Sequence, residues 1–96
     1  MTNIFDELVE KQRAAEQAHH RVEELRGMYG PPAQEGGWSP RQTTTYNTAW
    51  RAWRDLARDL RTAVADYAKA QGEPRSDVES QVRKAVLQKE PGDVEA

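Results

Sequence analysis

The sequence of 96 residues contains no cysteine and few large aliphatic side chains. The absence of cysteine excludes a disulfide scaffold and a thiol nucleophile. Leucine, isoleucine, valine and phenylalanine together number only 14, which is a small supply for a hydrophobic core. No apolar run approaches the roughly 18 residues that a membrane span requires. The N-terminus shows neither the basic nor the apolar segment of a secretory signal. We therefore expect a small cytoplasmic protein without membrane contacts.

Patterns that carry catalysis or bind metals are also scarce. His19 and His20 are the only histidines, and Glu16 precedes His19 by the spacing of half a di-iron carboxylate motif. The other half would need a further histidine, which the sequence lacks. Neither a glycine-rich phosphate loop nor a Ser–His–Asp arrangement is present. We expect no enzyme activity, metal, cofactor or small-molecule substrate, and we interpret both histidines as part of a solvated face paired with Glu23 and Glu24.

A first helix is predicted over residues 3–28. It should end at Gly30-Pro31-Pro32, because glycine suits the position after a helix and proline cannot continue its hydrogen bonds. Apolar or small side chains follow a heptad pattern along this stretch, broken once by Lys11: Ile4, Leu8, Ala15, Ala18, Val22, Leu25 and Tyr29.

A second helix is predicted over residues 40–71, and its start is the clearest local signal in the chain. Ser39 is a good N-cap, Pro40 suits the first helical position, and Gln42 completes a capping box. The helix should end before Gly72. Its apolar face is broad and steps by four and three residues through Tyr46, Trp50, Trp53, Ala57, Leu60, Val64 and Tyr67.

A short third helix is predicted over residues 77–89, starting from a second capping box formed by Ser76 and Glu79. Its apolar face would contain Val78, Val82, Ala85 and Val86. No alternating pattern of the kind that predicts strands is present. We interpret residues 1–90 as a single helical domain and residues 91–96 as a disordered tail.

These elements predict an all-α fold, a long antiparallel helical hairpin with a short third helix, similar in plan to a three-helix bundle. Close packing favours a register in which large side chains face small ones, so that Ala18 faces Trp53 and Leu8 faces Val64. Lys11 would lay its stem across the seam with its ammonium in water. The third helix is expected to pack against Leu56, Ala63 and Ala70 of the second helix and against Phe5 and Val9 of the first.

Five of the seven aromatic residues fall at the hairpin end, where only two helices and a loop are expected. One interpretation is that the loop folds back and Trp38 covers this region. The other is an interface with another protein or with a second copy of the chain, because tryptophan, tyrosine and arginine are enriched in interface hot spots. The candidate partner-binding residues are Tyr29, Trp38, Tyr46, Trp50, Trp53 and, at the rim, Arg54.

The net charge of −2 is distributed unevenly along the chain. Residues 1–29 carry four basic and six acidic groups, whereas residues 41–61 carry five arginines against two aspartates. Four of these arginines form one helical stripe, Arg51, Arg54, Arg58 and Arg61. Such a stripe beside tryptophans could bind nucleic acid, which gives an alternative function as a nucleic-acid-associated regulator. The simpler interpretation pairs the stripe with Asp55 and with the acidic first helix.

Overall fold

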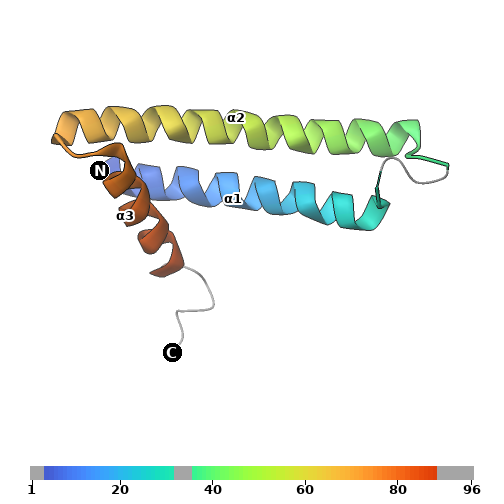
Figure 1. Cartoon of the computed structure of the whole chain (residues 1–96), viewed down its shortest axis with the longest axis horizontal. Coiled ribbons are helices and arrows are strands. Elements are labelled where there is room, and N and C mark those ends of the chain that lie inside the picture. Colours follow the sequence, from blue (N-terminus) through green and yellow to red (C-terminus); the bar gives the residue numbers. More distant parts are fainter. Residues whose placement is uncertain (1–3, 32–35, 89–96) are drawn as a thin grey trace.

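The computed structural model describes residues 4–31 and 36–88, and this part of the chain forms three helices and no strand (Figure 1). Helix α1 spans Ile4–Tyr29, α2 spans Pro40–Gln71 and α3 spans Arg75–Gln88. The two long helices lie side by side and antiparallel, and α3 is the shorter one. The all-α prediction of a hairpin with a short third helix is therefore confirmed. The predicted tail at residues 91–96 lies outside the described residues.

The ends of α2 form as the sequence predicts. The Gln42 backbone N–H donates to Ser39 Oγ at 3.1 Å, and the Ser39 N–H donates to Gln42 Oε1 at 2.9 Å, which completes the capping box. At the other end Gly72 adopts a φ of 67°, which glycine tolerates best. The Glu73 N–H then donates to the Ala68 carbonyl at 3.0 Å, so the chain reverses directly after α2.

The start of α3 differs from its prediction. The Pro74 carbonyl accepts hydrogen bonds from the N–H groups of Asp77 and Val78, so the helix begins at Arg75 and Ser76 lies inside its first turn. The second capping box predicted at Ser76 is therefore wrong. Glu79 accepts instead from Arg75 Nε at 3.2 Å, one turn away on the same helix.

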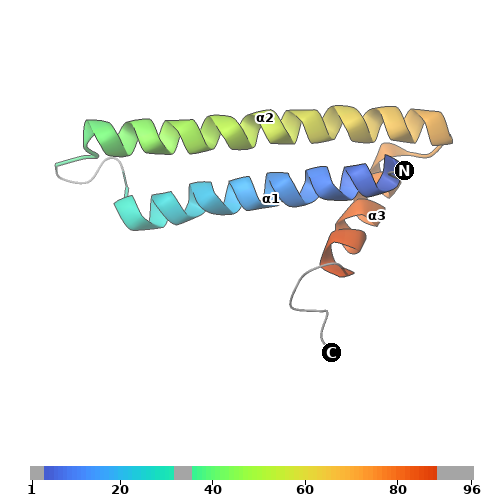
Figure 2. The same cartoon turned by 180° about the vertical axis from the view of Figure 1, so that it is seen from behind.

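The main core lies where α3 meets the start of α1 and the end of α2. It contains only aliphatic side chains, and the three α3 valines are at most 1% exposed: Leu8, Val9, Val64, Ala68, Val78, Val82 and Val86. In Figure 1 α3 crosses the start of α1 at a steep angle. In the opposite view of Figure 2, α1 lies in front of α3. Helix α3 thus covers one face of the hairpin at this end only.

The face of α2 that α3 covers was predicted incorrectly. Val64 and Ala68 are buried beneath α3, whereas Leu56 and Ala70 lie outside this core and Ala63 only packs at its margin. Packing α3 over Val64 is favoured because covering a valine removes more apolar surface from water than covering an alanine. The expected contact with α1 is confirmed, since Val9 belongs to the core and Phe5 packs against it.

The register between α1 and α2 agrees with the one predicted from large and small side chains. Leu8 and Val64 share the core, and the rings of Phe5 and Tyr67 lie 6.0 Å apart. Lys11 is half-buried at the seam, as predicted for its stem. Its ammonium, however, binds the Asp59 carboxylate on α2, with Nζ 2.7 Å from Oδ2.

Candidate interaction surface

The aromatic side chains at the hairpin end form two groups, and the first closes the turn. The Trp38 indole N–H donates to the Gly30 carbonyl at 2.9 Å. Its ring meets Tyr29 at 5.5 Å and Tyr46 at 4.9 Å between centroids, both edge to face, which is a favourable aromatic geometry. All three rings are half-buried. Trp38 therefore packs back onto both helices, as one of the two sequence interpretations expects.

The second group lies further along α2 and stays accessible. Trp50 is 38% exposed, and its ring packs nearly perpendicular to the Trp53 ring, with centroids 6.2 Å apart. The Arg54 guanidinium carbon lies 5.1 Å from the centre of the Trp50 ring, which is cation–π geometry. Of the six candidate residues, the structure thus brings Trp50, Trp53 and Arg54 together and assigns the other three to the turn. Among the described residues, the ring contacts of Trp38 are with Tyr29 and Tyr46.

His19 has a partner that the sequence analysis missed. Its imidazole stacks on Trp53 with ring centroids 4.4 Å apart and planes at 29°. Its Nε2 also lies 3.4 Å from Glu23 Oε2, so the predicted pairing along α1 is present as well. The predicted register could have indicated this contact. It places Ala18 opposite Trp53, and His19, the next residue along α1, can reach the same ring. His20 pairs with Glu24 and is exposed, as expected for a solvated face.

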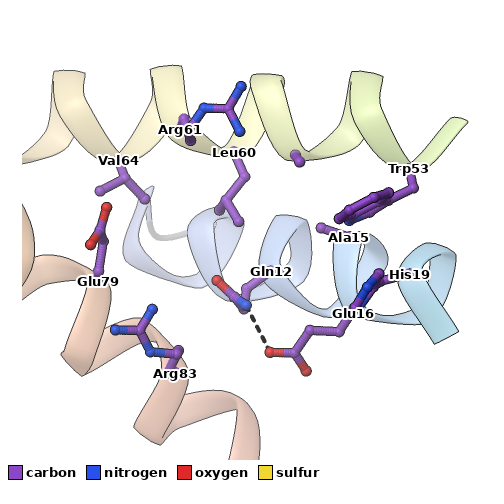
Figure 3. Close-up of a pocket in the computed structure, with 11 residues that line it drawn as sticks. Gln12, Ala15, Glu16, His19, Trp53, Leu60, Arg61, Val64, Glu79 and Arg83 are labelled. Atoms are coloured by element: carbon purple, nitrogen blue, oxygen red, sulfur yellow. Dashed lines mark hydrogen bonds between the residues drawn. The ribbon is translucent and has the colours of Figure 1, made fainter. Parts of the chain in front are cut away.

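An open groove of about 320 Å³ runs along the hairpin beside this second group (Figure 3). Its apolar floor comes from both long helices and contains Ala15, Ala57, Leu60 and Val64. Figure 3 shows the stacked His19 and Trp53 rings at one end of the groove. At the other end α3 directs Glu79 and Arg83 toward it. The groove exists because α3 covers only the far end of this face.

The groove and the exposed tryptophan lie on the same face of α2. Trp50, Arg54, Ala57 and Arg61 are spaced by four, three and four residues, which places them on one side of a helix. Ala57 and Arg61 line the groove, and Trp50 with Arg54 extends it toward the hairpin turn. The accessible surface is therefore continuous. It consists of Trp50, Trp53, Arg54, His19 and the groove, and we call it the open face.

The arginine stripe of α2 is exposed along its length, but its members have different surroundings. Arg54 lies over Trp50, and Arg58 binds Asp55 with Nη2 2.6 Å from Oδ1. Arg61 belongs to the groove wall. The predicted pairing with Asp55 is confirmed for Arg58. Asp59 binds Lys11 of α1, so the two aspartates of this segment, Asp55 and Asp59, form ion pairs with different basic residues.

Two further features of the described residues bear on binding. Within residues 4–31 and 36–88, no three histidine, aspartate or glutamate side chains are grouped closely enough to hold a metal ion. Over the same part of the chain, no helix combines the length and apolar character needed to cross a membrane.

Comparison with known proteins adds no relative to this description. No protein-family model, no curated protein and no solved structure matches the chain. The chemistry and geometry of the open face are therefore the features of this chain that indicate a function.

Proposed function

We propose that this chain is a small, non-catalytic, cytoplasmic interaction or assembly protein, and that a partner protein binds its open face. The observation that carries the proposal is the exposed Trp50 ring, held by Trp53 beneath Arg54 and continuous with an apolar groove. Tryptophan and arginine dominate interface hot spots, because they combine a large contact area with a polar group. A partner that covered Trp50 and Arg54 would remove from water the apolar surface that the hairpin alone leaves exposed.

The position of α3 supports this function over a purely structural role for the tryptophans. At the α3 end a third layer buries the aliphatic residues to a few per cent exposure. At the hairpin end the described chain supplies no third layer, and Trp38 occupies the turn rather than the open face. A partner seated on Trp50 and Trp53 would supply the missing layer.

Site-specific photo-crosslinking tests the proposal in cells that make the protein naturally. A photoreactive phenylalanine analogue replaces Trp50, and the matched control places the same analogue at exposed Thr48, on another side of α2. We expect a discrete adduct from position 50 and none from position 48, with mass spectrometry identifying the attached chain. A second copy in the adduct would show self-association. Equal labelling from both positions, or no adduct at all, would contradict the proposal.

The exposed arginine stripe supports a second candidate, a regulator bound to nucleic acid through Arg51, Arg54, Arg58 and Arg61. Such binding would release counterions and weaken steeply as salt is raised. An electrophoretic shift of DNA or RNA at low salt, lost at higher salt and lost in Arg51→Ala with Arg58→Ala, would favour it. No shift at low salt would remove it.

A further inference from the structure

The charged groups that line the groove are unequally paired. Glu16 accepts a hydrogen bond from Gln12 Nε2 at 2.7 Å, and Glu79 accepts one from Arg75 Nε at 3.2 Å. Arg61 on α2 and Arg83 on α3 also line the groove, yet neither forms an ion pair or a hydrogen bond with the residues that the structure describes. The wall therefore presents two available guanidinium groups from two different helices, whereas its carboxylates are already engaged.

The floor between these arginines is suited to the apolar side of a helix. Ala15 and Ala57 leave room for a backbone to approach closely, and the half-buried Leu60 supplies aliphatic contact. The lining residues on α1 extend from Gln12 to His19, which at the helical rise is roughly 10 Å, or about two turns. A segment of that length can direct apolar side chains at i, i+3 or i+4, and i+7 onto the floor.

We propose that the groove binds an acidic amphipathic helix of the partner protein. Its apolar side lies on Ala15, Ala57 and Leu60, and carboxylates on its flanks pair with Arg61 and Arg83. Arginine pairs with carboxylates in bidentate geometry, which fixes the position of the helix as well as attracting it. This inference rests on the proposed interaction function and specifies the chemistry of the partner.

An unbiased selection tests this chemistry on the full chain. A display library of helical peptides, with apolar residues on one face and randomised residues elsewhere, is selected for binding to the protein. We expect the enriched peptides to be net acidic. We also expect Arg61→Glu combined with Arg83→Glu to weaken them by about tenfold or more, because attraction becomes repulsion at both sites. The matched control is Arg41→Glu, which reverses an exposed charge of α2 outside the groove and should leave binding unchanged.

A charge exchange sharpens the selection. Changing the flanking acidic residues of the best peptide to lysine should restore binding to the Arg61→Glu, Arg83→Glu variant, while circular dichroism shows the variant fully helical. Enrichment of neutral or basic peptides, the absence of any binder, or binding unchanged in the double variant would overturn the inference. A second copy seated in the groove, shown by a doubled mass that the double variant abolishes, would also overturn it. The photo-adduct at position 50 separates the two proposals, since it would persist if only the acidic-helix inference fails.

Discussion

The two ends of this hairpin bury apolar side chains in different ways. At the α3 end seven aliphatic residues from three helices are almost fully excluded from water. At the hairpin end Val22 and Leu25 of α1 are also buried, but the other large residues are aromatic and pack in two groups of ring contacts, and Trp50 remains 38% exposed. The difference follows from the number of layers. A third helix closes a small aliphatic core, whereas two helices and a turn leave Trp50 partly in water.

This contrast assigns separate roles to the two ends. The α3 end supplies most of the burial that a chain with few large aliphatic residues needs in order to fold. The hairpin end combines a turn closed by Trp38 with an open face that a partner can cover. Substitutions at the α3 end should therefore affect stability, and substitutions on the open face should affect binding.

The largest expected effect on stability is at Leu8, which is 2% exposed in the core. Leu8→Ala removes buried methyl groups and leaves a cavity beneath α3, so the free energy of unfolding should fall by about 3 kcal/mol. Urea unfolding followed by circular dichroism measures the change. A loss comparable to that of a surface substitution would show that the α3 end does not hold the fold.

A smaller effect is expected at Trp38, which closes the turn. Trp38→Ala removes both aromatic contacts and the hydrogen bond to Gly30, and should cost about 2 kcal/mol. Trp38→Phe keeps a ring but loses the indole donor, so it should cost about 1 kcal/mol. The same unfolding assay applies. If Trp38→Ala left stability unchanged but abolished photo-crosslinking from position 50, Trp38 would belong to the interface instead of the turn.

The smallest effect is expected at Arg58, whose ion pair with Asp55 is exposed on both sides. Arg58→Ala should lower the free energy of unfolding by about 0.3 kcal/mol, because water and salt screen such pairs. The change should shrink further as salt is added. A loss above about 1 kcal/mol, which exceeds the usual range for exposed pairs, would mean that the arginine stripe contributes to folding at the hairpin end.

Much of the fold follows from local chemistry in the sequence. The cap at Ser39, the reversal at Gly72 and the heptad spacing each depend on neighbours close in the chain, so the bounds of α2 could be predicted residue by residue. The side on which α3 packs could not. That choice depends on the competition between Val64 and the neighbouring alanines, and on a helix start set by the Pro74 carbonyl rather than by Ser76.

The sequence predicts which residues form the candidate site, but it does not predict how they pack or that a groove lies beside them. Trp50, Trp53 and Arg54 are recognisable from residue type and spacing, and the structure brings these three together. The stacking of His19 on Trp53 requires the packing angle of the two helices as well as their register. The groove additionally depends on where α3 stops covering the hairpin, so the roles of Arg61 and Arg83 emerge only from the assembled structure.

The division of roles between the two ends is tested most directly by the double variant Trp50→Ala with Trp53→Ala. Its helical circular dichroism and its cooperative urea unfolding should be measured beside the unaltered chain. We expect the helical signal and a cooperative transition to survive, and partner binding or self-association to be lost. A double variant that unfolds outright would show that these tryptophans belong to the core, and would contradict the proposal that the open face is an interface.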